Sequence, residues 1–287
     1  MQLDWHLITA LVERWRPETH TFHMPCGECT ITLQDVAVQL GLPVDGEPVV
    51  GSLLYDWKVL CEDYLGEMKG QRLSLPWLAE QFTELPPDAD VVSVQRYARA
   101  YIMQLIGGFL FADKSNTLVH CMFLPLLINF DQAGTYAWGA ACLAWLYREL
   151  CRASNARSLE IAGPLILLQV WAYDRFPILA PQVPVEVSIG RPLSFRWSGV
   201  IPLSELSANM LITYRMFFDR LINSQINWTP YTSHIMALLP RQCHNGQAMW
   251  TYVGPMICFH LVEKHQAGRV LRQFHMLQMP PEFCSTD

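Results

Sequence analysis

Apolar residues recur at helical spacing along most of the chain. Leu3, Leu7, Leu11 and Trp15 follow one another every four positions, which is the period of one face of an α-helix. Pro17 comes soon after this stretch and ends it, because proline cannot continue a helix. Comparable patterns predict further helices over residues 52–65, 75–83, 90–111, 119–130, 135–152, 159–175, 204–222 and 268–277. The chain is therefore expected to be mainly α-helical.

A β-hairpin is predicted near the N-terminus, where the hydrophobic period changes to two. Polar and apolar residues alternate over 19–24 and over 29–33, and the segment 25–28 between them reads Pro-Cys-Gly-Glu. A turn over 24–27 has proline at its second position and glycine at its fourth, which is typical of a type I turn. A second small β element is expected near 185–255, with a short strand at 185–189.

A short helix is expected directly after the hairpin. Thr32 can cap its first turn, and Asp35 stands three residues later as the reciprocal partner of a capping box. Gly41 can adopt the left-handed conformation with which many helices end. The pair Asp45-Gly46 predicts another turn.

A proline-rich segment over 177–202 carries little helical pattern. Connections of this length are uncommon inside a compact unit. We therefore expect one compact multi-helix domain over 1–287, in which the segment 177–202 would join two lobes, 1–176 and 203–287.

Charged residues are scarce relative to apolar residues. The hydrophobic fraction is 51% and the charged fraction is 16%, whereas a typical soluble domain carries about 25% charged residues. A large domain with a high buried fraction would account for this balance, and so would an apolar surface that faces a protein partner. The second explanation favours an interaction function.

Direct nucleic-acid binding is an alternative function that the net charge does not support. The chain carries a formal net charge of −6, whereas proteins that hold phosphates need a basic face. Local basic clusters exist at Arg269 and Arg272 and at Arg148, Arg152 and Arg157. Cations at helix C-termini explain such clusters equally well.

No membrane span, signal peptide or disulfide framework is expected. The longest uncharged stretch, 132–147, contains two glycines and a threonine and is shorter than the roughly 18 apolar residues that a span needs. The first residues lack the continuous apolar run of a signal peptide. The nine cysteines follow no regular spacing, which suits reduced thiols in a cytosolic or nuclear protein.

Four side chains that can bind metal are evenly spaced within the hairpin. His20, His23, Cys26 and Cys29 follow one another every three positions, and both residue types are zinc ligands. His20 and His23 would point to opposite faces of a strand, because side chains alternate along it. These residues are therefore weak metal candidates, and we expect a hairpin with hydrogen-bonded histidines, packed cysteines and no bound metal.

The segment 11–51 contains a series of short motifs and reads LVERWRPETHTFHMPCGECTITLQDVAVQLGLPVDGEPVVG. A tryptophan-arginine helix end is followed by Thr-His-Thr-Phe-His, Gly-Glu, Thr-x-x-Asp-Val, Gly-Leu and Asp-Gly. This pattern resembles the plant mobile domain family. The residues that carry it are Arg14, Trp15, Thr19, His20, Thr21, Phe22, His23, Gly27, Glu28, Thr32, Asp35, Val36, Gly41, Leu42, Asp45 and Gly46.

The resemblance continues over nearly the whole chain. It includes the strings YARAYIMQLIGGFLFADKS, TYAWGAACLAWLYREL, LLQVWAYDRF, NWTPY and RVLRQFHMLQMPP. His275 stands where the family usually has a glycine. The resemblance implies structural or interaction roles for further residues in these strings, namely Trp138, Gly139, Trp171, Trp228, Arg269 and Arg272.

The resemblance implies a non-catalytic protein-interaction module of a plant nuclear protein. Related nuclear proteins act in transposable-element silencing, genome integrity and meristem maintenance, and other copies of the domain are carried by transposons. The implied partner is a phosphatase-like protein with the same domain, or a second copy of the chain.

The family is also described as aminotransferase-like, and the residues do not favour that activity. An aminotransferase holds pyridoxal phosphate through a lysine Schiff base and a phosphate cradle. The four lysines, Lys58, Lys69, Lys114 and Lys264, lie in no recognisable cofactor motif, and no glycine-rich phosphate loop is present. We therefore expect no catalytic residues and no cofactor, and an enzyme is the less favoured alternative.

Overall fold

The computed structural model describes residues 1–52, 55–65, 72–115, 117–155, 157–158, 160–183, 186–206 and 209–279. Helices dominate these ranges and the strands form small antiparallel sheets, which confirms the mainly α-helical fold class. The α-helices are α1 (Trp5–Val12), α2 (Leu33–Leu40), α3 (Trp57–Tyr64), α4 (Leu75–Gln81), α5 (Val91–Leu105), α6 (Phe130–Ala133), α7 (Trp138–Ala153), α8 (Leu165–Arg175), α9 (Met210–Asp219), α10 (Ser233–Leu238) and α11 (Gln247–Trp250). The strands are β1 (Trp15–Arg16), β2 (Thr21–Met24), β3 (Gly27–Cys29), β4 (Arg72–Ser74), β5 (Leu118–His120), β6 (Val253–Cys258) and β7 (Leu261–Gln266). One π-helical turn, η1 (Ile106–Leu110), and short 3-10 helices complete the elements: η2 (Cys121–Leu127), η3 (Pro177–Leu179), η4 (Leu193–Trp197), η5 (Leu203–Leu206), η6 (Asn223–Gln225), η7 (Arg241–His244) and η8 (Ala267–Phe274).

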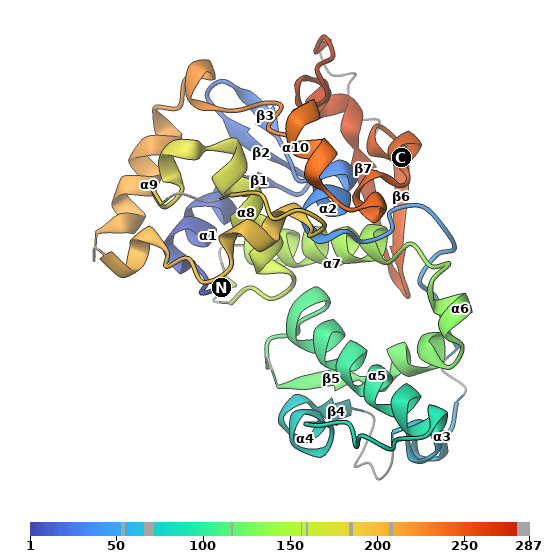
Figure 1. Cartoon of the computed structure of the whole chain (residues 1–287). Helices are drawn as coiled ribbons and strands as arrows, with labels where there is room; N and C mark the ends of the chain where they lie inside the picture. Colours follow the sequence, from blue (N-terminus) through green and yellow to red (C-terminus); the bar gives the residue numbers. More distant parts are fainter. Residues whose placement is uncertain are drawn as a thin grey trace.

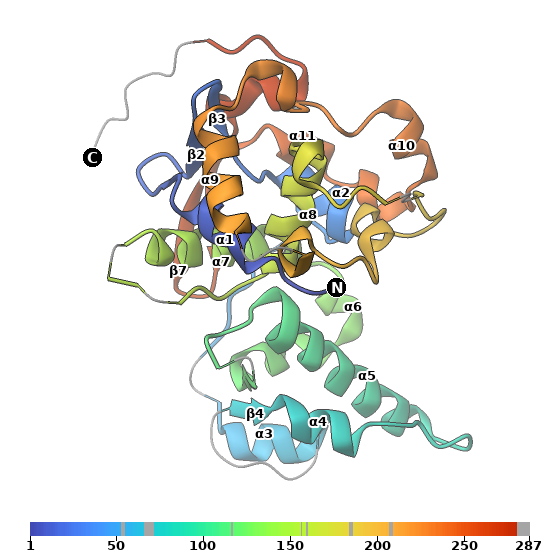
Figure 2. The same ribbon diagram turned by 90° about the vertical axis from the view of Figure 1, so that its left-hand side faces the viewer.

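Two bodies are visible in the ribbon (Figures 1 and 2). The smaller body contains α3, α4, α5, β4 and β5, and the larger body contains the N-terminal strands and the helices and strands from α7 onward. Elements from both sides of the segment 177–202 meet in the larger body, because α1 packs against α9 and α2 packs against η4 and η7. The visible division therefore differs from the lobes 1–176 and 203–287 that the sequence suggested.

Helix α7 packs against β6, β7, α2 and β1 in the larger body. At its first turn the amide of Gly139 donates a hydrogen bond of 2.7 Å to the carbonyl of Pro43. A Cβ at position 139 would lie 2.9 Å from that carbonyl oxygen and 2.9 Å from the side chain of Val44. Glycine therefore lets the backbone of α7 approach the chain after α2.

Helix α8 is buried on all sides over residues 167–175. Trp171 lies within it, and its ring centroid is 5.2 Å from that of Phe22 on β2. A helix that is buried all round belongs inside a core. In the described part of the chain, neither α8 nor any other helix is long and apolar enough to cross a membrane.

The predicted hairpin and the helix after it are confirmed. β2 pairs with β3 in antiparallel register, with Met24 opposite Gly27, and β1 adds a third strand that the sequence pattern did not reveal. The capping box of α2 is present, with Thr32 donating its amide to Asp35 over 2.7 Å. Gly41 ends α2 in the left-handed conformation, with a φ of 67°.

The helix predicted over 119–130 is wrong. Residues 118–120 form β5, which pairs with β4, and η2 and the single turn of α6 follow. Pro125 lies inside η2, and its missing amide cannot make the hydrogen bond that a continuous α-helix requires. A strand and two short helical segments therefore replace one helix.

The other helices are present, several with shorter bounds. α4, α5 and α7 confirm the helices predicted over 75–83, 90–111 and 135–152, and η1 continues α5. The helix predicted over 159–175 begins only at Leu165, because Pro164 and the left-handed Gly163 precede it. The helices predicted over 52–65, 204–222 and 268–277 correspond to α3, α9 and η8. Residues 53, 54, 159, 207 and 208 lie outside the described part.

The second β element lies later than predicted. β6 and β7 form an antiparallel hairpin over 253–266. Residues 186–189 form no strand, and residue 185 lies outside the described part. Gly190 turns the chain there with a φ of 72° and donates to the carbonyl of Leu238 over 3.1 Å, so the segment packs as a turn.

Candidate functional site

The N-terminal hairpin is fastened to η8 by an arginine–glutamate pair. Arg269 donates to both carboxylate oxygens of Glu28, through Nε at 2.7 Å and Nη2 at 2.6 Å. Thr21 donates a third hydrogen bond of 3.1 Å. Burial acts to raise the pKa of Glu28, but the bonds and charge of Arg269 hold it below its ordinary value of 4.5. Bidentate arginine–carboxylate pairs of this kind are among the stronger polar contacts.

A second arginine of η8 holds the tip of the hairpin. Arg272 donates to the carbonyl of Cys26 over 3.1 Å, and its guanidinium lies 5.5 Å from the centre of the Trp228 ring. Gly27 has a φ of 129°, and a Cβ there would lie 3.5 Å from the Arg272 guanidinium. The turn, Trp228 and η8 therefore form one packed unit.

Two buried residues whose contacts the sequence did not reveal complete this junction. Gln273 accepts from the amide of Thr30 at 2.9 Å and donates to its carbonyl at 2.8 Å, as a neighbouring strand would. His265 accepts a hydrogen bond of 3.4 Å from the amide of Leu33 at the start of α2. Burial lowers the pKa of His265 to about 4, so the ring is neutral and can accept. No local pattern marks either residue, because each acts only across the fold.

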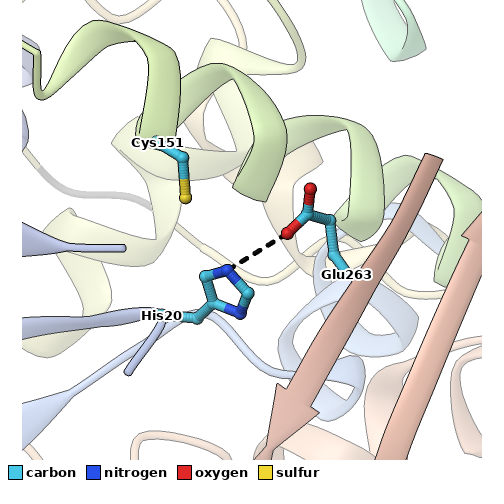
Figure 3. A group of neighbouring side chains, drawn as sticks. All are labelled: His20, Cys151 and Glu263. Carbon is cyan, nitrogen blue, oxygen red and sulfur yellow. Dashed lines mark ion pairs between the residues drawn. The ribbon is translucent and has the colours of Figure 1, made fainter. Parts of the chain in front are cut away.

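His20 lies at the meeting point of three chain segments (Figure 3). Its Nε2 is 3.1 Å from a carboxylate oxygen of Glu263 on β7, and the thiol of Cys151 on α7 lies beside it. The potential ligand atoms of these three residues all lie within 4.8 Å of one another. Burial acts to lower the pKa of His20, but hydrogen bonds with Cys151, Glu263 and the carbonyl of Lys264 raise it to about 10.

Neighbouring residues fix the orientation of this group. His20 Nδ1 lies 2.9 Å from the carbonyl oxygen of Lys264. The indole of Trp15 donates to the sulfur of Cys151 over 3.3 Å. Arg148 Nε lies 2.7 Å from the second oxygen of Glu263. His20 itself has a φ of 51°, a conformation that costs a non-glycine residue energy and is found at functional sites.

The four evenly spaced metal candidates do not form one site in this structure. His20 faces Glu263, whereas His23 Nε2 lies 3.2 Å from the hydroxyl of Thr19 and 3.7 Å from Glu28. Cys29 is fully buried, and this burial raises the pKa of its thiol. His23 lies in β2, whereas His20 precedes that strand in the left-handed conformation, so the two histidines have different partners.

A buried ion pair joins α2 to α8. Arg175 Nη2 lies 2.8 Å from Asp35 Oδ1, and both side chains are 0% exposed. Tyr231 donates to the same carboxylate oxygen over 2.6 Å. Arg175 also donates to the carbonyl of Trp228. Asp35 therefore caps its own helix and anchors α8 and the segment around Trp228.

A parallel polar network lies next to this ion pair. Gln39 donates to Asp174 over 2.6 Å, and Arg196 pairs with the other carboxylate oxygen. Burial raises the pKa of Asp174, although Arg196 opposes that effect. These residues join α2, α8 and η4, and the sequence pattern did not single them out.

The remaining residues of the family pattern also make contacts within the fold. Arg14 on the chain after α1 pairs with Asp219 on α9 at 2.6 Å. The indole of Trp138 donates to the carbonyl of Ala133 over 2.8 Å. Asp45 accepts from the amide of Gly46 over 2.9 Å, and this turn brings residue 46 against the chain before α7. Each of these residues therefore makes a contact within the fold.

The basic clusters are largely engaged by acidic or carbonyl groups of the same chain. Arg148 pairs with Glu263, and Arg152 pairs with Glu149 at 3.0 Å. Arg269 and Arg272 contact the hairpin as described above. These contacts leave fewer cations available for phosphates than the sequence indicates.

The lysines of the described part lie at the surface. Lys58 pairs with Glu62, and Lys114 pairs with Glu160, each at 3.8 Å. Lys114 lines a cavity of about 500 Å³ beside α1. Lys69 lies outside the described residues. A lysine that forms a Schiff base is activated by removal from water or by neighbouring cations, whereas these two are exposed and paired with acids.

An apolar stripe is exposed along α5. Val91, Val94, Tyr101 and Leu105 are 72%, 44%, 63% and 42% exposed. Their spacing of three, four and seven residues places them on one face of the helix. The opposite face of α5 carries the buried residues, including Met103. The stripe therefore presents a continuous apolar face on the smaller body.

Comparison with known proteins identifies relatives over the full length of the chain. The family model described as "Plant mobile domain" matches residues 1–287. The chain is 46% identical to the "Serine/threonine-protein phosphatase 7 long form homolog" of Arabidopsis thaliana, over 100% of this chain and 23% of that protein. It is 40% identical to "Protein MAIN-LIKE 1" and 37% identical to "Protein MAINTENANCE OF MERISTEMS" of the same plant, each over 98% of this chain.

These relatives are longer than the part that the chain matches. The matched region spans 56% of "Protein MAIN-LIKE 1" and 59% of "Protein MAINTENANCE OF MERISTEMS". No solved structure matches the chain. The full-length family match and the identity to these relatives agree with the motifs whose contacts are described above, and the chain belongs to the plant mobile domain family.

Proposed function

We propose that this domain is a non-catalytic protein-interaction module that binds another plant mobile domain. Its place would be a nuclear assembly that silences transposable elements and supports genome integrity and meristem maintenance, or a transposon-borne counterpart. The observation that carries the proposal is the exposed apolar stripe of α5, formed by Val91, Val94, Tyr101 and Leu105.

The use of the family-pattern residues supports a scaffold role. Glu28, Asp35 and Arg269 form ion pairs within the fold, and Arg272 contacts the hairpin turn. Polar side chains that are engaged in this way support the shape of the domain. The α5 stripe, by contrast, is exposed at the surface of the smaller body, and exposed apolar faces of this kind are typical of interaction surfaces.

A second plant mobile domain is the partner class that the relatives favour. The phosphatase homolog contains a region that is 46% identical to this chain and makes up 23% of its length. The same domain therefore occurs in proteins of different overall length. A shared fold allows like surfaces to pair, either between two copies of this chain or between this chain and such a relative.

Binding can be tested with a stripe variant and a matched surface control. The chain is analysed by size-exclusion chromatography with light scattering, alone and with the matching domain of the phosphatase homolog. Val94→Glu should weaken association at least about tenfold, because it places a charge in an apolar contact. Ile189→Glu is the control, since Ile189 is 82% exposed and lies outside the stripe.

A chain that stays monomeric and does not bind the relative's domain would refute the proposal. If Val94→Glu and Ile189→Glu weakened association equally, the assignment of the α5 stripe as the binding surface would be refuted. Gel shifts with DNA and RNA at several salt concentrations test the nucleic-acid alternative, because phosphate-driven binding weakens steeply with salt. An aldimine absorbance after addition of pyridoxal phosphate would support the enzyme alternative.

A further inference from the structure

We propose that His20, Cys151 and Glu263 form a binding site for one Zn²⁺ ion. An imidazole nitrogen, a thiol sulfur and a carboxylate oxygen come from the hairpin, α7 and β7. Imidazole, thiolate and carboxylate are the protein ligands that zinc uses, at about 2.0–2.3 Å from the ion. Ligand atoms that lie within 4.8 Å of one another can surround a single ion after small movements of the side chains.

The direction of the three groups favours coordination over nucleophilic catalysis. A catalytic relay places its base between the nucleophile and the acid, and it uses a different ring nitrogen for each. Here Nε2 of His20 faces the carboxylate of Glu263, and the sulfur of Cys151 lies on the same side of the ring. The other nitrogen, Nδ1, is held by the carbonyl of Lys264 at 2.9 Å. The donors thus converge on one point.

The residues around the three donors have the arrangement that supports metal ligands. A ligating histidine almost always donates its other ring N–H to a carbonyl or carboxylate, and His20 meets the carbonyl of Lys264 in this way. The indole of Trp15 donates to the sulfur of Cys151 over 3.3 Å and so holds that sulfur in position. Arg148 approaches Oε1 of Glu263 at 2.7 Å, whereas Oε2 faces Nε2 of His20 at 3.1 Å, so a metal ion can replace the proton between these two atoms.

Binding replaces protons with the metal ion. Coordination requires the thiolate of Cys151 and an unprotonated Nε2 on His20, so the thiol proton and any proton on Nε2 are released to solvent. Three protein ligands leave the fourth tetrahedral position for water or for a group from a partner. The ion would connect the hairpin, α7 and β7, and the site does not depend on the α5 surface.

Cobalt is a spectroscopic probe for this site, since Co²⁺ bound to a thiolate gives a charge-transfer absorption. The full chain is purified under reducing conditions, freed of metal, and titrated with Co²⁺ alone. Zn²⁺ is then added to displace the bound Co²⁺, and the affinity for Zn²⁺ is measured by competition with a chelating dye. We expect one equivalent of Co²⁺ and a thiolate band in the unmodified chain.

The variants separate this site from the evenly spaced hairpin residues. Cys151→Ser should abolish the thiolate band, and Glu263→Gln should weaken Zn²⁺ binding more than about 100-fold, beyond the 10–100-fold effect of changing a residue that only supports a ligand. Cys26→Ser and His23→Gln should bind as the unmodified chain does. Circular dichroism verifies that each variant is folded.

A variant-independent measurement keeps the proposal testable if a variant fails to fold. X-ray absorption of the zinc-loaded chain should show one sulfur and two or three nitrogen or oxygen ligands. Two or more sulfur ligands, or no stoichiometric uptake of Co²⁺ or Zn²⁺, would overturn the proposal. Loss of the band in Cys26→Ser with retention in Cys151→Ser would overturn it as well.

Discussion

The buried pair of Asp35 and Arg175 gives the most demanding prediction for stability. Asp35→Asn keeps the shape of the side chain but removes its charge. The carboxylate accepts hydrogen bonds from Arg175, Tyr231 and both the amide and hydroxyl of Thr32. Whichever way the new amide is oriented, its NH₂ group faces hydrogen-bond donors. Asparagine therefore cannot satisfy these partners.

The magnitude follows from the two roles of Asp35. Removing one partner of a fully buried ion pair costs about 3–5 kcal/mol, because the other charge is left uncompensated. Weakening the capping of α2 adds about 1 kcal/mol. We therefore expect the free energy of unfolding to fall by about 4–6 kcal/mol, a large part of the roughly 5–15 kcal/mol typical of a folded domain.

Urea unfolding followed by tryptophan fluorescence and circular dichroism measures this loss. Asp219→Asn is the control, since Asp219 is 70% exposed in its pair with Arg14 and should cost no more than about 1 kcal/mol. The double variant Asp35→Asn/Arg175→Met should be less destabilised than the two single variants together, because it removes both charges. A loss of less than about 1 kcal/mol in Asp35→Asn would refute the reasoning.

Three further predictions concern backbone conformation and pH. His275 ends η8 in the left-handed conformation, with a φ of 59°. Glycine adopts this conformation without strain, so His275→Gly should raise the free energy of unfolding by about 1 kcal/mol, whereas His275→Ala should not. Urea unfolding of the two variants measures the difference. A Cβ at Gly46, which has a φ of 132°, would lie 2.2 Å from the carbonyl oxygen of Thr135. Gly46→Ala should therefore lower the free energy of unfolding by roughly 3 kcal/mol or more, which thermal unfolding measures as a lower melting temperature. An unchanged melting temperature would contradict the described turn. Burial acts to raise the pKa of Glu28, but Arg269 holds this pKa below its ordinary value of 4.5. The ion pair therefore stabilises the fold above about pH 4.5, and this stabilisation is lost as the pH falls through the lowered pKa. Glu28→Gln should therefore flatten the decline of unfolding free energy between about pH 5 and pH 3, measured by urea unfolding at each pH.

Local features of the fold could be predicted because their causes are local. The capping box of Thr32 and Asp35 and the left-handed Gly41 require only neighbouring residues, and all three are present. The helix predicted over 119–130 failed because hydrophobic period was weighed more heavily than Pro125. The strand pairing of β5 with β4 depends on residues far away in sequence.

The candidate site could be predicted only in part. The sequence singled out His20 for its spacing to His23 and to two cysteines. Its actual neighbours, Cys151 and Glu263, come from segments more than a hundred residues away. Periodicity and spacing describe residues that are close in the chain, so they cannot reveal such neighbours. The same reason explains why Arg175 was not recognised as the partner of Asp35.

The fastening of the hairpin to η8 has a consequence for how the protein is made. Glu28 and Thr30 are translated 241 and 243 residues before their partners Arg269 and Gln273. Until then the hairpin lacks the contacts that hold it against the larger body. Domains generally fold as units during and after synthesis, so the nascent chain would acquire its native N-terminal arrangement only after the segment that contains Arg269 and Gln273 has been synthesised.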